Sequence, residues 1–78
     1  MPRFYFHLTD DAFVPDPDGI DFADAEAARA AAVDGIRGMI CDQVKHGRLC
    51  LGYSMEVVDE AGERVAAFRF SDAVRVEP

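Results

Sequence analysis

Apolar and polar residues alternate from residue 3 to residue 9, which places Phe4, Phe6 and Leu8 on one face. A period of two built on aromatic side chains is typical of a β-strand that covers a core with one of its faces. A shorter alternation follows in residues 19–22. We therefore expect a long first strand and a short second strand that runs back along it.

The segment between these two stretches, residues 10–19, is rich in Asp and Pro and ends in the run PDPDG. Proline lacks the amide donor that helices and central strands need. Asp and Gly are typical turn residues. The segment is therefore predicted to form a loop or a wide hairpin turn.

The next segment has the period of a helix. Asp24 can accept the free amides of a first turn, and Glu26 adds a favourable charge against the helix dipole. Gly47, after Lys45 and His46, is a plausible end of the helix. The apolar stripe recurs at spacings of three and four, and it comprises Ala25, Ala28, Ala32, Ile36, Met39, Ile40 and Gln43 or Val44.

Two glycines interrupt this predicted helix. Gly35 and Gly38 each cost about 1 kcal/mol relative to alanine in a helix interior. They bracket Ile36. We interpret them as positions where the backbone approaches a partner closely.

Alternation returns in residues 53–58 and 64–70, and residues 59–63 read as a turn between them. Ala66, Phe68 and Phe70 are expected on one face of the last strand. The fold class predicted from this order is α+β: an antiparallel sheet of three to four strands in ββαββ order, with one long helix packed on one face.

Length and charge narrow the picture further. The 78 residues form a single domain, residues 1–78, whose core supplies no more than roughly 3 to 5 kcal/mol of net stability, so a homodimer is expected. Eight basic and fifteen acidic residues give a net charge of -7, which disfavours nucleic-acid binding. We expect no membrane span and no secretion signal, hence a cytoplasmic protein with Cys41 and Cys50 reduced.

Four short runs carry a resemblance to a known family: FYFHL in residues 4–8, DPDG in residues 16–19, Asp24 with EAARA in residues 26–30, and FRFSDAV in residues 68–74. Together they resemble a family of short bacterial proteins classed as a domain of unknown function. Its members open with an aromatic strand ending in His-Leu or a close variant, carry an Asp-Pro-Gly-type loop, and close with an aromatic strand and Asp-Ala-Val. The resemblance covers nearly the whole chain and implies no activity.

A weaker likeness is to the antitoxin half of a bacterial toxin–antitoxin pair, where an aromatic strand, an acidic turn, a returning strand and a Glu-Ala-rich helix occur in that order. The returning strand is short here, and we expect no separate DNA-binding segment of the kind such antitoxins commonly carry. The likeness implies a neutraliser whose acidic loop, Asp10 to Asp24, binds a basic partner protein.

The candidate chemistry is sparse. His7 is the one histidine placed on a strand, where it can serve as a general base, a ligand or an interface contact. Cys41, His46 and Cys50, joined by His7, would make a zinc set of acceptable chemistry, but their spacing matches no standard finger. We therefore assign no catalytic residue, no cofactor and no metal ligand.

Other polar groups have plainer explanations. Asp16, Asp18 and Asp21 have the oxygen ligands that calcium prefers but not the spacing of a calcium loop, so we expect turn-forming aspartates. The basic cluster of Lys45, His46 and Arg48 is explained by the negative pole of a helix C-terminus.

The sheet face opposite the helix is predicted to carry an interaction surface comprising Tyr5, His7, Tyr53, Val58 and Val65, with Ala67 nearby. Aromatic and histidine side chains are common at interfaces, and an apolar open face is unfavourable in water. We expect an uncharacterised, non-enzymatic protein-interaction module that acts as a homodimer. The alternatives are the antitoxin-like neutraliser of a basic partner, and a small metal-binding protein or enzyme centred on His7.

Overall fold

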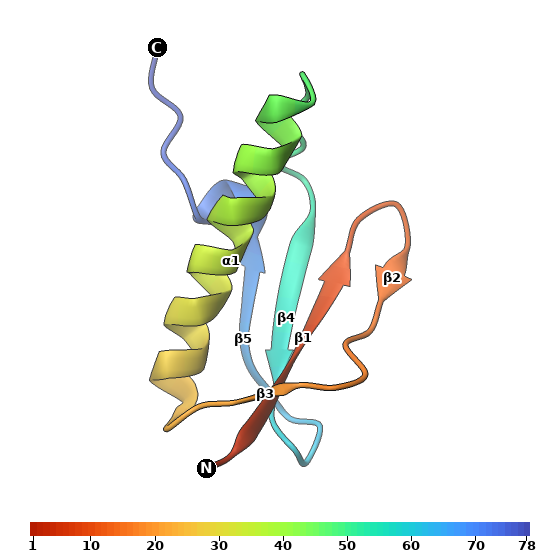
Figure 1. Cartoon of the computed structure of the whole chain (residues 1–78), viewed down its shortest axis with the longest axis vertical. Coiled ribbons are helices and arrows are strands. Elements are labelled where there is room, and N and C mark those ends of the chain that lie inside the picture. The colour runs from red at the N-terminus through yellow and green to blue at the C-terminus, as the bar shows by residue number, and fades with distance from the viewer.

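The chain forms one helix and a five-stranded antiparallel sheet in the computed structural model, which describes residues 1–78 (Figure 1). The elements in chain order are β1 (Arg3–Thr9), β2 (Phe13–Val14), β3 (Ile20–Asp21), α1 (Ala25–Lys45), β4 (Ser54–Val58), β5 (Arg64–Arg69) and a short 3-10 helix, η1 (Phe70–Asp72). The α+β class, the long first strand, the short returning strand and the C-terminal hairpin are confirmed. The two-residue strand β2, inside the predicted loop, is an addition to the predicted elements.

The sheet is organised around β1. On one side β1 pairs with β4 along Tyr5 to Thr9, and on the other side it pairs with β3 near its beginning and with β2 near its end. The order across the sheet is β2-β1-β4-β5, with β3 also beside β1. The proline-rich segment between β2 and β3 leaves the sheet, as the missing amides of proline require.

The helix begins where the sequence predicts. The Asp24 side chain accepts a hydrogen bond of 2.8 Å from the Ala27 amide, which satisfies one of the free donors of the first turn. The helix ends at Lys45 with His46 as its last cap residue. Gly47 follows with a φ of 80°, a left-handed conformation that terminates helices and favours glycine.

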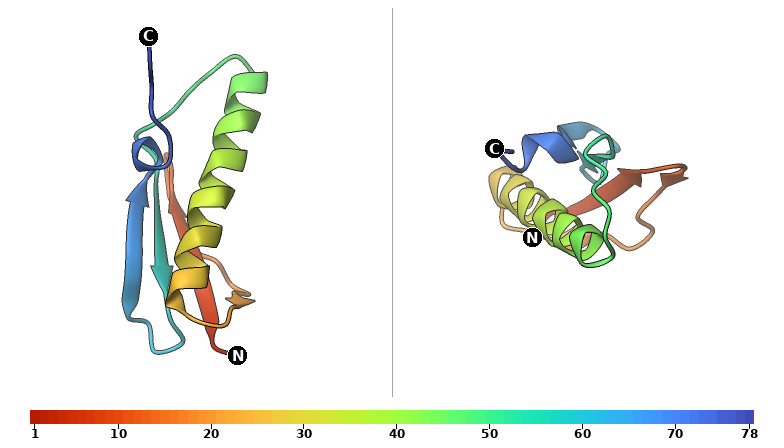
Figure 2. Two further views of the ribbon diagram at one scale, coloured as in Figure 1. Left: turned by 90° about the vertical axis from the view of Figure 1, so that its left-hand side faces the viewer. Right: turned by 90° about the horizontal axis from the view of Figure 1, so that it is seen from above.

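The helix covers one face of the sheet (Figure 1) and contacts the core through every fourth residue: Ala28, Ala32, Ile36 and Ile40 are buried. This stripe is narrower than predicted, because Met39 is 37% exposed and Val44 is 58% exposed. Its two N-terminal members are small and its two C-terminal members are large. In the left view of Figure 2 the C-terminal end of α1 lies farther from β4 and β5 than its N-terminal end.

The last strand departs from the predicted alternation at both ends. A bulge shifts the register between Val57 and Val58, so that Val65 has no direct partner and packs against the core cluster. Phe70 was expected to continue the strand beyond Phe68, but it begins η1, because the Arg69 amide donates to the Asp72 side chain at 2.8 Å and turns the chain. Phe70 is 1% exposed, so it stays in the core.

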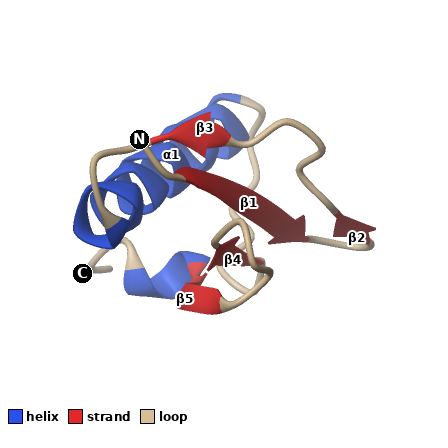
Figure 3. Cartoon of the chain, turned by 90° about the horizontal axis from the view of Figure 1, so that it is seen from below, coloured by secondary structure: helices blue, strands red, loops and turns tan.

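Only ten of the 78 residues are buried, in a flat molecule with extents of 40 × 24 × 17 Å. A single helix does not cover the whole of its sheet face, as the end-on views in Figure 2 and Figure 3 show. No helix combines the length and the apolar character that crossing a bilayer requires. A core of this size leaves little stability in reserve, so single core substitutions should have large effects.

Replacing Ile36, which is fully buried at the middle of the stripe, tests this. We expect Ile36→Ala to lower the free energy of unfolding by about 2–5 kcal/mol, because it removes buried methylene groups and leaves a cavity. Val44→Ala, on the exposed side of the same helix, should change it by less than about 0.5 kcal/mol. Urea denaturation of both variants makes the comparison; equal effects would contradict the assignment of the stripe.

Candidate functional site

An open groove of about 500 Å³ lies beside the C-terminal half of α1. Leu8 on β1, Tyr53 just before β4 and Phe70 in η1 line its sheet side. The helix side is formed by Gly35, Gly38 and Met39, and Asp42 and Gln43 lie at its end. The groove is thus the part of the sheet face from which the helix diverges.

The two helical glycines form a flat wall of this groove. A Cβ atom added to Gly35 or to Gly38 would meet no other atom within 4 Å. Both residues have ordinary helical backbone, since neither has a positive φ. Nothing within one copy of the chain therefore requires glycine at either position, although each costs about 1 kcal/mol relative to alanine.

A polar hollow of about 450 Å³ adjoins the groove and shares Asp42, Gln43 and Tyr53 with it; His46 and Arg48 complete its lining. Arg48 donates from Nη2 to Cys50 Sγ at 3.1 Å and to Tyr53 Oη at 3.2 Å. The Gln43 side chain accepts a hydrogen bond of 2.9 Å from the Cys50 amide. The helix end and the following loop thereby hold a thiol, a guanidinium and a phenol together.

The electrostatics of this cluster favour the thiolate. The hydrogen bond from Arg48, and then that from Tyr53, lower the pKa of Cys50 below its ordinary value, although partial burial and the Asp11 carboxylate oppose the shift. The hydrogen bond with Cys50, followed by partial burial, raises the pKa of Tyr53. The two shifts have the directions that favour a thiolate at Cys50 beside a protonated phenol at Tyr53.

A second polar cluster fixes the proline-rich loop against β1. The Asp16 carboxylate accepts hydrogen bonds from the amides of Phe6 at 3.2 Å, Asp18 at 3.1 Å and Gly19 at 3.2 Å. Its own amide donates to His7 Nδ1 at 3.0 Å. Phe6 lies between the residues of β1 that pair with β3 and those that pair with β2, so Asp16 supplies the acceptor that no strand provides there.

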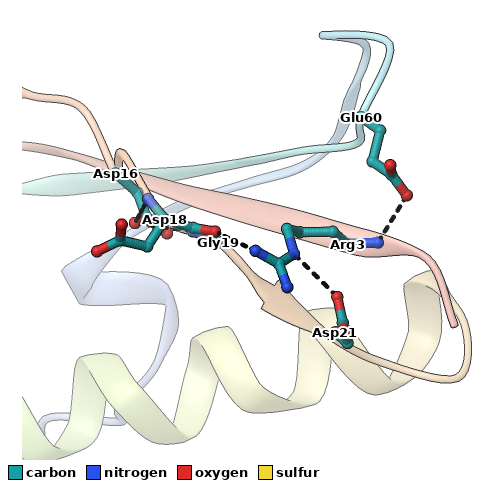
Figure 4. A network of polar contacts seen from close by, with 6 residues as sticks. All are labelled: Arg3, Asp16, Asp18, Gly19, Asp21 and Glu60. Atoms are coloured by element: carbon teal, nitrogen blue, oxygen red, sulfur yellow. Dashed lines mark hydrogen bonds and ion pairs between the residues drawn. The ribbon is translucent and has the colours of Figure 1, made fainter.

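Arg3 and Gly19 anchor the other end of this loop (Figure 4). Arg3 Nε donates to Asp21 Oδ1 at 3.0 Å, Arg3 Nη1 donates to the Asp18 carbonyl at 3.0 Å, and the Arg3 amide donates to Glu60. Gly19 has a φ of 69°, and a Cβ there would lie 2.9 Å from the Phe4 carbonyl oxygen. Only glycine fits both that conformation and that approach.

The five residues of the predicted interaction surface do not lie together. Tyr5 and His7 are half-buried on the face turned away from the helix, and Val58, opposite Tyr5, is buried outside the main core cluster. Tyr53 and Val65 pack against the core cluster instead. That outer face also carries an ion pair of 3.7 Å between Arg64 and Glu56, so it is less apolar than the alternation alone indicated.

His7 has a structural environment. Besides accepting from the Asp16 amide, its ring lies 5.6 Å from that of Phe13 on β2, and it lines none of the cavities. No group of three or more His, Cys, Asp or Glu side chains is placed to hold a metal ion. Neither the set of His7, Cys41, His46 and Cys50 nor the set of Asp16, Asp18 and Asp21 therefore converges.

Comparison with family models places the chain in a family. The model described as Domain of unknown function (DUF6894) matches residues 3–71. The chain belongs to this family. Neither the curated proteins nor the solved structures include a match to it. The match to DUF6894 spans every strand and the helix, so the polar clusters described above are parts of the family domain and not of an added segment.

Sequence reasoning identified most of the groove-lining residues only as helix or strand positions. The contact of Arg48 with Cys50 and Tyr53 was missed, because it depends on the path of the loop after α1 and not on a periodic pattern. The one available signal was the basic residue two positions before a cysteine.

Removing the Asp16 carboxylate from the DUF6894 domain should weaken the anchoring of the loop. We expect Asp16→Ala to lower the free energy of unfolding by about 1–3 kcal/mol, because three amides lose a charged acceptor. Asp18→Ala is the matched control, since the Asp18 side chain makes no hydrogen bond, and it should cost less than about 0.5 kcal/mol. Equal losses in urea denaturation would contradict this role for Asp16.

The contribution of Asp16 should depend on pH. Partial burial raises the pKa of its carboxyl group, but the hydrogen bonds from Phe6, Gly19 and Asp18 together lower it further, so the net pKa lies below its ordinary value. The carboxylate therefore stabilises the fold above the unfolded pKa of about 3.9, and this contribution is lost as pH falls through the folded pKa. The stability gap between the native chain and Asp16→Ala should be constant near neutrality and close in strong acid.

Proposed function

We propose that this domain is a non-enzymatic protein-interaction module that acts as a homodimer, and that the groove beside α1 is its interface. The observation that carries the proposal is the shape of the groove wall. Met39, which is 37% exposed, lines the groove together with Gly35 and Gly38, which have no side chains. A large exposed side chain and a recess thus lie next to each other on one patch.

This arrangement suits a second copy of the same chain. In a two-fold symmetric interface the same patch meets itself, so each copy must offer both a projection and a recess. Met39 of one copy would enter the groove of the other beside the two glycines, where it can contact Leu8 and Tyr53. Methionine is flexible and polarizable, which suits it to filling such a recess.

The areas are compatible with a stable dimer. The isolated chain exposes 5235 Å². A standard interface removes about 800 Å² per partner from water, which is a modest share of that surface. The long axis of 40 Å, along which α1 runs in Figure 1, offers the length for such a contact. Burial of this kind supplements a core that contains only ten residues.

Charge influences this association in a defined direction. Each copy carries a net charge of -7, so two copies repel each other, and the attraction must come from apolar contact. Salt screens the repulsion more than it affects apolar burial. A homodimer of this kind should therefore become tighter as ionic strength rises, whereas binding of a basic partner should become weaker.

The alternatives draw less support. The antitoxin-like role needs free carboxylates between residues 10 and 24, but Asp10, Asp16, Asp21 and Asp24 form hydrogen bonds or an ion pair within the chain. A catalytic or metal-binding role for His7 competes with its contacts to the loop.

A charge placed at Met39 should disrupt the interface. We expect Met39→Asp to shift the intact native mass from twice the 8.6 kDa chain to the single chain, because an unpaired carboxylate would be buried between the copies. Val44→Asp adds the same charge to the same helix outside the groove, and it should remain dimeric. A monomeric native chain, or a dimer that survives Met39→Asp, would refute the proposed interface.

Replacing either glycine by alanine should change the stability of the monomer and the affinity of the dimer in opposite directions. Gly35→Ala and Gly38→Ala should each stabilise the monomeric fold by up to about 1 kcal/mol, because alanine favours the helix and the added Cβ meets no atom. The same substitutions should weaken the dimer, because the Cβ atoms occupy the recess. Sedimentation equilibrium at low and high salt measures the second effect, and unfolding at a concentration below the dissociation constant measures the first. An unchanged dissociation constant would place the contact elsewhere.

A further inference from the structure

We propose that the outer edge of β5 is a docking site for an extended acidic segment of a partner protein, which joins the sheet as one further strand. Addition of a strand to an exposed sheet edge is a common mode of peptide recognition. The proposal goes beyond the homodimer and does not depend on it, because no residue of β5 lines the groove or either of the other cavities.

β5 has one neighbour in the sheet. It lies at the end of the strand order β2-β1-β4-β5 (Figure 1) and pairs with β4 alone. Directly opposed residues of an antiparallel pair alternate between hydrogen-bonded and non-hydrogen-bonded. The Phe70 amide donates to the Tyr53 carbonyl at 2.8 Å, so Ala67, three positions earlier, is in a non-hydrogen-bonded pair with its partner Glu56. The amide and the carbonyl of Ala67, which is exposed, therefore point away from β4.

The two ends of this edge are covered from within the chain. The Val65 carbonyl accepts a hydrogen bond of 3.3 Å from Arg29 Nη1, and the Arg69 amide donates to the Asp72 side chain at 2.8 Å. A partly covered edge of this kind resists pairing along its whole length with another copy of the chain. The main chain around Ala67 is left open for one short added strand.

Basic side chains gather along this edge. The 6 residues of β5 include Arg64 and Arg69 and no acidic residue. Arg29 and Arg37 reach the same side of the molecule from α1, since Arg29 contacts β5 and Arg37 Nε donates to the Ala73 carbonyl at 2.7 Å, directly after η1. Half of the 8 basic residues of a chain with a net charge of -7 therefore lie along β5 and η1.

These charges select the occupant. A second copy paired antiparallel through Ala67 would bring Arg64 and Arg69 of the two copies side by side, and neighbouring like charges destabilise a sheet. An acidic strand has the opposite effect. Glu56 on β4 provides the precedent, because its carboxylate lies 3.7 Å from the guanidinium of Arg64. A carboxylate on a strand added at the other side of β5 can contact the same arginines, and Arg29 can exchange its carbonyl acceptor for a charged one.

A synthetic strand tests this chemistry. The probe is a short fluorescent peptide of alternating Glu and Val, blocked at both ends, and its anisotropy is followed as the full chain is added. We expect saturable binding that weakens as ionic strength rises. Arg64→Gln and Arg69→Gln should each weaken the binding about threefold, the size typical of an exposed ion pair. Lys45→Gln removes the same charge at the C-terminal end of α1, which diverges from β5 (Figure 2), and should leave the affinity unchanged. No saturable binding, or equal binding of the same peptide with Lys in place of Glu, would overturn the proposal.

A second measurement distinguishes strand addition from attraction between charges alone. Methylating the amides of alternate peptide residues keeps every charge but removes the donors along one edge of the peptide. We expect one alternating set, the one that faces β5, to weaken binding about tenfold when methylated, and the other set to have little effect. In the complex, the Ala67 amide should gain protection from hydrogen exchange. Equal effects of the two sets, or an Ala67 amide that exchanges as fast as in the unbound chain, would contradict the docking site. A native chain that proves monomeric would refute the homodimer and leave this proposal intact.

Discussion

The size gradient along one helix stripe determines the shape of this domain. Ala28 and Ala32 let the N-terminal half of α1 approach the sheet closely, whereas Ile36 and Ile40 occupy more space between helix and strands. The helix consequently diverges from β4 and β5 as it proceeds (Figure 2). The groove lies where the gap between α1 and the sheet is widest. Phe70 and Tyr53 line its sheet side, and only a longer side chain on the helix would fill the gap. The interface proposed for a second copy is therefore a direct consequence of core packing.

The loop between β2 and β3 covers the edge of β1 that does not pair with β4. Strand edges with unpaired amides are prone to pair with other chains. Here two short strands cover the ends of that edge, and the Asp16 carboxylate covers the Phe6 amide between them. Gly19 and Arg3 then hold the loop close to the strand. This local closure leaves the groove, and not the β1 edge, as the apolar opening of the molecule.

The regular elements could be predicted from the sequence because each follows from a local rule. The period of two identifies β1, the Asp24 cap identifies the start of α1, and the acidic turn identifies the hairpin. Features that depend on tertiary geometry could not be found in this way. The bulge that turns Val65 toward the core, and the tight turn that ends β5 before Phe70, break the alternation without a distinctive residue signal.

The candidate site, too, could be predicted from the sequence only in its local features. Gly35 and Gly38 were recognisable as an unexplained cost in a helix, which pointed to close approach by a partner. Their position on the wall of a groove required the helix to be placed on the sheet. The open-face surface built on Tyr5, His7, Tyr53, Val58 and Val65 failed at two positions. Tyr53 alternates in step with the buried Met55 and Val57 and therefore faces the core, and Val65 lies at the bulge, where the alternation breaks.

The position of β1 also determines the order in which the chain can fold during synthesis. Its longest pairing is with β4, which begins 45 residues after β1 ends and follows the whole helix. While the ribosome is still adding residues 10 to 50, the aromatic run of β1 has only the two short strands to pair with. The edge that pairs with β4 therefore stays unpaired until the C-terminal hairpin has been made. Unpaired strand edges of this kind are prone to aggregate while the rest of the chain is being made.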